Sequence, residues 1–376
     1  MSFTGKIFSM KNPLSYSSSG VNYNNLDKIK RLAQTSALET SKNIESSGFK
    51  ALDQSRGETA FVWDEGDSYK ALVIESLGTK STIAEEVLSK TGKSYYGEIA
   101  QDSVAMVIND LIVVGAKPLV ANAYFGLGNS DWLLENGKGE DLIKGFAAAC
   151  DLSGAVWGGG ETPSLTGVIN EQAIDLAGSA VGIINPKDRL MLGDKIQSGD
   201  AIIFIESNGI HANGISLVRK IADELPDRYQ TKLPSGTTLG ESVLRPTHIY
   251  AKAIEILFNE GINIHYLSNI TGHGFRKIMR AKEEFSYVIE ILPEVDELFK
   301  FIQENSGMSD EDMYGTFNMG AGFAIILPKT ESEKAAEIIT DAGFKAIIAG
   351  HVEQGEKQVI IKPLNITFKS ESLNIR

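Results

Sequence analysis

The stretch "IFIESNGIHANGISLVRKI" (residues 203–221) joins an apolar strand to an amphipathic helix through a loop that holds two Asn-Gly pairs. Gly209 and Gly214 permit positive φ angles, and a helix that begins near Gly214 presents free N–H groups and the positive end of its dipole. We therefore expect an anion-binding junction with His211 at its mouth, where the ring would donate to a phosphate, stabilise an oxyanion or transfer a proton. A loop histidine with a purely structural contact is the alternative. The polar side chains of this junction are Asn208, His211 and Asn213.

Two further Gly-rich junctions follow in the same half of the chain. The first is "NITGHGFRKIM" (269–279), with Thr271 and His273, and the second is "TFNMGAGF" (316–323). Three such junctions in one half favour a ligand-binding region over three unrelated turns.

The helix predicted over 98–115 contains a local contradiction. Its middle, "VAMVINDLIVV" (104–114), is apolar nearly all round, which predicts burial, yet it contains Asp110. A buried carboxylate without a partner is costly, so Asp110 needs a cation, a metal ion or N–H donors. Asp102 lies about 80° round the helix and ~12 Å along it, so both residues could line one cleft. The alternative is a structural salt bridge or cap.

Two short segments in the N-terminal half combine acidic residues with turn residues. In "ESLGTK" (75–80), Glu75 ends a strand, and Thr79 and Lys80 follow a glycine turn. Such oxygens beside an ammonium suit hydrated Mg²⁺ and a phosphate chain. The spacing is not that of a Walker A motif, and an ordinary turn is the alternative.

In "WGGGETP" (157–163), successive glycine N–H groups could form an anion-binding nest after a short strand. A carboxylate beside that nest would need a divalent cation, so Glu161 is a candidate metal ligand. A β-bulge or tight turn is the alternative. The other candidate ligand-contacting residues of this segment are Gly159, Gly160 and Thr162.

The composition limits the classes of partner. The net charge of −13 disfavours a polyanionic partner, so we expect no nucleic acid. A single cysteine, Cys150, is typical of a reducing compartment, and no secretory signal is apparent, so we expect a cytoplasmic protein. No run of about 18 apolar residues occurs, so we expect no membrane span.

The order of elements predicts an α/β (mixed α+β) protein of two domains. An arm (1–23) precedes an N-terminal domain (24–185) and a C-terminal domain (186–376), with the turn-rich segment 185–200 at the boundary. The helices predicted outside the central N-terminal one include 24–42, 214–225, 242–260, 294–305 and 331–342. The strands predicted in the second half are 201–206, 262–268, 285–292, 321–327, 345–350 and 357–362.

Taken in order, these elements resemble the phosphoribosylformylglycinamidine cyclo-ligase (AIR synthetase) family over nearly the whole chain. The segments that carry the resemblance include "LGTK", "DSVAMVINDLIVVGAKPL", "GGGETP", "DLAGSAVGII", "SNGIHANGISLVRKI", "LRPTHIYAKAI", "NITGHGFRKI" and "MYGTFNMGAGF".

The resemblance implies a homodimer whose N-terminal sheets pair into a barrel, with ATP bound near the interface. It implies the ATP-dependent cyclisation of formylglycinamidine ribonucleotide (FGAM) to aminoimidazole ribonucleotide (AIR), with Mg²⁺ as the metal ion. It further implies metal ligands, first Asp110 and Glu161 and then Glu75 and Asp102. Lys80 would contact ATP phosphates, and the catalytic candidates are His211, Asp110 and Lys80.

Several positions depart from the family pattern. The arm reads "YSSSGVN" (16–22) where the family has Tyr-Lys-Asp-Ala-Gly-Val-Asp, so Ser17, Ser18 and Asn22 stand in place of a lysine and two aspartates. Glu75 and Ser76 replace Asp and Gly, "ETPSLTG" lacks a Met-Pro-Gly run, and His273 replaces a glycine. Two alternatives therefore stay open: a small-molecule kinase of the same superfamily, and a non-catalytic nucleotide-binding dimer.

Overall fold

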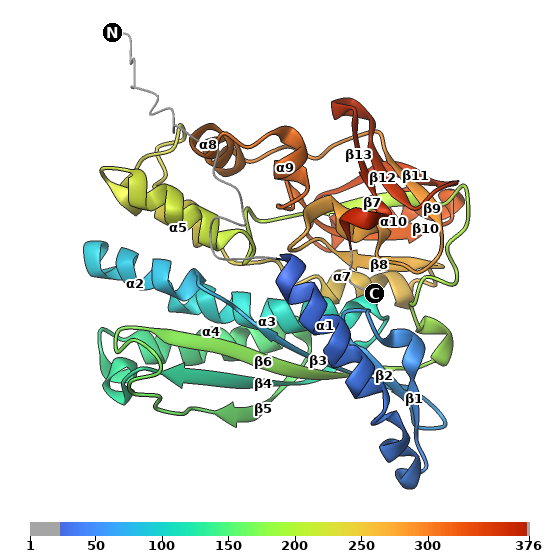
Figure 1. The fold of residues 1–376 in the computed structure, drawn as a ribbon, viewed down its shortest axis with the longest axis horizontal. Coiled ribbons are helices and arrows are strands. Elements are labelled where there is room, and N and C mark those ends of the chain that lie inside the picture. The colour runs from blue at the N-terminus through green and yellow to red at the C-terminus, as the bar shows by residue number, and fades with distance from the viewer. Residues whose placement is uncertain (1–22, 374–376) are drawn as a thin grey trace.

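The computed structural model describes residues 23–373, which form two α/β halves stacked on one another (Figure 1). The two mixed sheets confirm the predicted fold class. Helix α1 (Tyr23–Leu38) corresponds to the helix predicted over 24–42 and ends earlier. The predicted arm departures at Ser17, Ser18 and Asn22 lie outside the described residues.

The N-terminal half is built on a six-stranded sheet of order β1-β2-β3-β6-β4-β5. Helix α3 (Tyr96–Val113) packs on the sheet, and α4 (Lys138–Ser153) packs beside α3 (Figure 1). Helix α2 (Lys80–Thr91) follows the glycine turn after β3. The strands are β1 (Lys50–Leu52), β2 (Phe61–Asp64), β3 (Tyr69–Ser76), β4 (Lys117–Leu127), β5 (Val156–Glu161) and β6 (Ile174–Ile184).

The C-terminal half is built on a seven-stranded sheet of order β13-β12-β9-β11-β7-β10-β8. Its strands are β7 (Ala201–Glu206), β8 (Tyr266–Asn269), β9 (Phe285–Ile289), β10 (Ala321–Leu327), β11 (Ala346–Gln354), β12 (Gln358–Ile361) and β13 (Ile366–Lys369). Its helices are α5 (Ile215–Glu224), α6 (Leu239–Val243), α7 (Ala251–Asn259), α8 (Glu297–Ser306), α9 (Asp310–Tyr314) and α10 (Ser332–Asp341).

The single helix predicted over 242–260 is wrong. The structure has the short helix α6, then an irregular segment that contains Pro246, then α7. Proline has no N–H group and its ring disfavours a helical residue before it, so the helical pattern is interrupted there. We call residues 245–250 the connecting segment.

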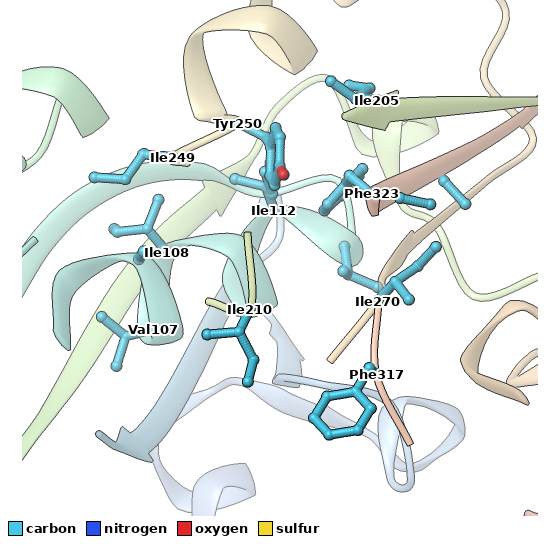
Figure 2. Close-up of a cluster of buried hydrophobic side chains, with 14 of the residues drawn as sticks. Val107, Ile108, Ile112, Ile205, Ile210, Ile249, Tyr250, Ile270, Phe317 and Phe323 are labelled. Carbon is cyan, nitrogen blue, oxygen red and sulfur yellow. The ribbon is translucent and has the colours of Figure 1, made fainter. Parts of the chain in front are cut away.

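Helix α3 forms the apolar junction between the two halves. In Figure 2, Val107 and Ile108 of α3 lie on one side of a buried cluster, Phe323 of the C-terminal half lies on the other, and Ile112 of α3 and Tyr250 lie between them in this view. These five side chains are all buried, which explains why the middle of α3 is apolar on nearly every face.

Polar side chains of α3 bind the backbone of the connecting segment. The Asn109 amide donates to the carbonyl of His248 (2.8 Å) and accepts from the N–H of Tyr250 (3.0 Å). The Gln101 amide donates to the carbonyl of Thr247 (2.9 Å). A segment without regular secondary structure thereby gains partners for backbone groups that would otherwise be buried without any.

One face of the N-terminal sheet carries exposed apolar side chains. Leu72 and Ile74 of β3 are 42% and 75% exposed, whereas Ala71 and Val73, on the opposite face of the same strand, are buried. In the part of the chain that the structure describes, no helix is both long enough and apolar enough to cross a bilayer.

Candidate active site

A cavity of about 290 Å³ lies where the two halves meet, and we call it the interdomain cavity. Its walls come from α1, from β3 and α3 of the N-terminal half, and from the loops that follow β7 and β8 in the C-terminal half. The residues that carry its chemistry are Glu75, Asp110, Asn213, Thr271, His273 and Lys277.

The acidic side of the interdomain cavity consists of Glu75 and Asp110. The alternation of β3 places Glu75 on the same face as the buried Val73, toward α3, where Asp110 is located. Asp110 is buried, and its Oδ1 accepts a hydrogen bond from the Asn269 amide (2.7 Å). Burial, together with the nearby Asp110 carboxylate, raises the pKa of Glu75 to about 7.

The raised pKa of Glu75 predicts a pH-dependent contribution to stability. The folded chain binds this proton more tightly than the unfolded chain, so the stabilisation is complete below the ordinary pKa of 4.5 and is lost as the pH rises through about 7. Glu75→Gln cannot ionise. We expect the free energy of unfolding of the variant, relative to the wild type, to rise by up to about 3 kcal/mol between about pH 5 and pH 8. Urea denaturation over this range measures the difference, and a difference independent of pH would contradict the expectation.

The lining of the interdomain cavity also includes a hydrogen-bond donor without a partner. The Nδ2 atom of Asn213 is buried and, among the described residues, makes no hydrogen bond. Gly214, the residue after Asn213, has a φ of 82°, which suits glycine, and a Cβ at this position would lie 2.1 Å from the ring of Phe317. The backbone beside Asn213 therefore depends on this glycine. A buried donor that lines the same cavity as two carboxylates, and bonds to neither, is expected to gain its partner from a ligand with negatively charged oxygens.

These residues fit a magnesium ion bound together with a phosphate chain. Within residues 23–373, no three His, Cys, Asp or Glu side chains gather as a metal site. Mg²⁺ commonly takes one or two carboxylates and completes its shell with substrate phosphates and water, so a pair such as Glu75 and Asp110 is sufficient. The unpartnered Asn213 amide suits an oxygen of the same phosphate chain.

Lys80 and Asp102 do not share the interdomain cavity, so the prediction that Asp102 and Asp110 line one cleft is wrong. Both side chains are fully buried, with Lys80 Nζ 2.6 Å from Asp102 Oδ2. Lys80 also donates to the carbonyl of Arg245 (3.0 Å), and Asp102 Oδ1 accepts from the N–H (2.8 Å) and hydroxyl of Thr247. Burial raises the pKa of Asp102 and lowers the pKa of Lys80, while the contact between them opposes both shifts. The structural salt bridge is therefore the correct alternative for Asp102.

The structure of the glycine-rich segment "WGGGETP" (157–163) also differs from the prediction. Residues 156–161 form the edge strand β5, so the expected glycine loop after the strand is wrong. A Cβ at Gly160 would lie 2.1 Å from the carbonyl oxygen of Ala123, and the pairing of β4 with β5 shifts register between Ala121 and Ala123. Close strand pairing at a bulge explains this glycine. The predicted ligand contacts of this segment are exposed and lie away from the interdomain cavity: Gly159, Gly160, Glu161 and Thr162.

His211 is not at the mouth of a site, so that prediction is wrong. Its ring is buried, and its Nε2 accepts a hydrogen bond from the N–H of Asn208 (3.1 Å). Burial, and then the neighbouring His248, lower the pKa of His211 well below its ordinary value, so the ring is neutral. The Asn208 amide donates to the carbonyl of Pro246 (3.0 Å), which ties the loop to the connecting segment. His211 and Asn208 thus shape the loop that presents Asn213.

The backbone conformation of the turn after β8 explains why the family pattern has glycine where this chain has His273. His273 has a φ of 73°, a conformation that costs a non-glycine residue about 1–2 kcal/mol. Burial and the neighbouring Lys277 lower the pKa of its ring to about 3, so His273 is neutral where it lines the cavity.

We expect His273→Gly to be more stable than His273→Ala by about 1 kcal/mol. Both variants remove the ring, and only glycine relieves the backbone. Thermal and urea denaturation of the two variants measure the difference; an alanine variant at least as stable as the glycine variant would show that the backbone is not strained.

Sequence reasoning missed Lys277 and Arg280, which lie on the same wall of the interdomain cavity. Arg280 donates to the carbonyl of Gly57 (3.0 Å) and lies 3.7 Å from Glu58. The signal that could have found Lys277 is a lysine followed by an apolar pair directly after a Gly-rich junction, in "GHGFRKIM" (272–279).

Comparison with known proteins relates both halves to one family. The N-terminal domain described as "AIR synthase related protein" matches residues 57–184, and the corresponding C-terminal domain matches residues 197–362. The chain is 37% identical over 347 residues to a phosphoribosylformylglycinamidine cyclo-ligase of Methanobrevibacter smithii, which covers 92% of this chain and 96% of the relative. It is 38% identical over 301 residues to the same enzyme of Alkaliphilus oremlandii, with 76% and 82% covered.

Solved structures share the fold at low sequence identity. The crystal structure of a HypE-HypF complex aligns with a TM-score of 0.59 at 18% identity and covers 84% of this chain and 93% of that chain. AaThiL complexed with AMPPCP and TMP aligns with a TM-score of 0.56 at 16% identity, with 83% and 90% covered. These structures show the shared fold, and the two matched domains with the relatives of 37% and 38% identity establish that the chain belongs to the phosphoribosylformylglycinamidine cyclo-ligase family.

Proposed function

We propose that this protein closes the imidazole ring of AIR from FGAM and ATP in purine biosynthesis, with ADP and phosphate as the other products. The observation that supports this most strongly is the 37% identity to a cyclo-ligase over nearly the full length of both chains. ATP phosphorylates the formyl amide oxygen of FGAM and so converts it into a leaving group. A nitrogen of the amidine side then attacks the formyl carbon, and phosphate departs.

In this proposal the interdomain cavity holds the phosphate chain of ATP. Asp110 and Glu75 would hold Mg²⁺, which neutralises the charge of the phosphate oxygens. The Asn213 amide, which has no partner among the described residues, would donate to an oxygen of the nucleotide or of the reacting amide. Because Asn269 holds Asp110 and the backbone of Gly214 holds Asn213, these groups need little reorganisation when the ligand binds.

We further propose that the protein is a cytoplasmic homodimer that pairs through the exposed face of its N-terminal sheets. Leu72 and Ile74 give this face an apolar strip, and their cross-strand partners on β6 are Val181 and Ser179. Burial of exposed apolar area of this kind drives association. The exposed edge strand β5 would then border the interface, which is where Glu161 and Thr162 could contribute to a ligand site.

The test of the proposed activity is the release of ADP from ATP that depends on FGAM, with the formation of AIR followed in the same reaction. We expect one AIR for each ADP in the purified wild-type protein. A stable phosphorylated product in place of AIR would identify a small-molecule kinase. Binding of ATP without turnover in the presence of FGAM would identify a non-catalytic dimer.

A further inference from the structure

Two lysines lie near the junction of the two halves, Lys80 fully buried and Lys277 partly buried, and they differ in what their ammonium groups contact. Lys80 Nζ is 2.6 Å from Asp102 and also donates to a backbone carbonyl. Lys277 comes from the 3-10 helix η7 (Gly274–Met279) and lines the interdomain cavity. Within residues 23–373, no side chain forms an ion pair with Lys277.

The surroundings of Lys277 favour an anionic ligand. Burial, and next the positive charge of Arg280, lower the pKa of Lys277 to about 8, while Asp110 and Glu75 oppose the shift. Lys277 is therefore still mainly protonated at neutral pH. A partly buried cation without a directly bound anion loses part of its hydration without compensation, and the same cavity holds the unpartnered Asn213 donor. Both groups gain a partner if negatively charged oxygens enter the cavity.

The carboxylates of the same cavity do not fill this role. If Glu75 and Asp110 bind Mg²⁺, their negative charge is neutralised by the metal ion and not by Lys277. Lys277 and Asn213 are then available to bind the phosphate oxygens of the ligand that the metal ion does not bind. A lysine beside a metal ion is a common arrangement for a phosphate chain, because the ammonium acts as a point charge on the phosphate oxygens.

We propose that Lys277 is the lysine that contacts the phosphate chain of ATP in this protein, and that Lys80 instead holds the two halves together through Asp102. The proposal rests on the proposed function, since it names a residue of the same nucleotide site. It replaces the ATP contact that the family resemblance implies for Lys80.

The test compares the binding of a non-hydrolysable ATP analogue, AMPPCP, with Mg²⁺ by titration calorimetry. We expect Lys277→Met to weaken the binding of Mg·AMPPCP by about 10- to 100-fold, because a charge-assisted hydrogen bond is lost. Lys277→Arg should retain most of the affinity. Adenosine, which has no phosphate, should bind the wild type and Lys277→Met equally.

The matched control is Lys282→Met, which removes the same charge from an exposed lysine nearby that does not line the cavity. We expect it to bind Mg·AMPPCP with the wild-type affinity. The melting temperature of Lys277→Met should equal or exceed that of the wild type, because no ion pair of the described chain is broken.

Wild-type affinity of Lys277→Met for Mg·AMPPCP, or an equal loss of adenosine binding, would overturn the proposal and leave the proposed function intact. A wild-type protein that binds no Mg·AMPPCP would overturn both. Weakened binding in Lys282→Met as large as that in Lys277→Met would show that long-range charge is responsible, and would also overturn the assignment of a contact.

Discussion

Replacing Asp102 with alanine is expected to lower the free energy of unfolding by about 3–5 kcal/mol, one of the largest losses available to a single side chain in this protein. The substitution leaves the fully buried Lys80 ammonium without its carboxylate. It also leaves the N–H and hydroxyl of Thr247 without their acceptor, at the point where the connecting segment meets α3. Urea denaturation followed by tryptophan fluorescence, together with the melting temperature, measures the loss.

Three control variants distinguish the effect of breaking the buried Lys80–Asp102 pair from the effect of removing any charged side chain. Lys80→Met should be destabilising to a similar degree, because it leaves the Asp102 carboxylate buried and unpaired. The double variant Lys80→Met/Asp102→Leu should recover most of the loss, since neither charge remains. Lys144→Met removes one partner of an exposed ion pair with Glu140 and should leave the stability close to that of the wild type. A loss of under about 1 kcal/mol in Asp102→Ala would show that water or a rearranged side chain compensates Lys80.

Replacing Asp110 with asparagine is expected to reduce the FGAM-dependent rate by on the order of 10²–10³-fold, the largest effect that we predict on activity. The substitution removes the charge that would bind Mg²⁺ and keeps an oxygen that can accept the hydrogen bond from Asn269. The fold should therefore persist, with a melting temperature close to that of the wild type. Steady-state kinetics measure kcat/KM, and electron paramagnetic resonance measures the binding of Mn²⁺ in place of Mg²⁺.

Glu98→Gln provides the matched control for Asp110→Asn, because Glu98 is a carboxylate in the first turn of the same helix that does not line the interdomain cavity. It should keep both the wild-type rate and the wild-type Mn²⁺ affinity. If Asp110→Asn loses activity yet binds Mn²⁺ as the wild type does, Asp110 acts through another residue and is not a metal ligand. An unchanged rate would remove Asp110 from the site altogether.

Asp102 and Asp110 show where sequence reasoning succeeds and where it reaches its limit. Both are carboxylates in one helix, and the sequence predicts that Asp110 needs a partner and that Asp102 could line the same cleft. The hydrogen-bond partners Thr247 and Asn269 lie 145 and 159 positions further along the chain, and Lys80, which pairs with Asp102, lies on another helix. The local sequence pattern therefore indicates that a buried carboxylate has a partner, but it does not identify the partner. Asp102 proves to be structural, whereas Asp110 lines the interdomain cavity.

Other differences have equally local causes. Strands β1, β2 and β13 were not predicted, and each has only three or four residues, over which the alternation of side chains gives a weak signal. The positive φ of His211 turns its ring inward, and no pattern of residue types encodes that turn. The strand, loop and helix over 203–221 follow the prediction, because hydrophobic period and glycine position dominate there.

The hydrogen bonds between α3 and the connecting segment make the two halves interdependent. A fragment that ends at Ile184 would retain Lys80, Asp102 and Asn109 in its core but lose the backbone groups of residues 245–250 that these side chains bind. A C-terminal fragment produced separately would expose Tyr250 and the carbonyls of the connecting segment. A gene divided within 185–200 should therefore yield soluble, functional protein only when both pieces are synthesised in the same cell, which makes this locus suited to a split-protein reporter of co-expression.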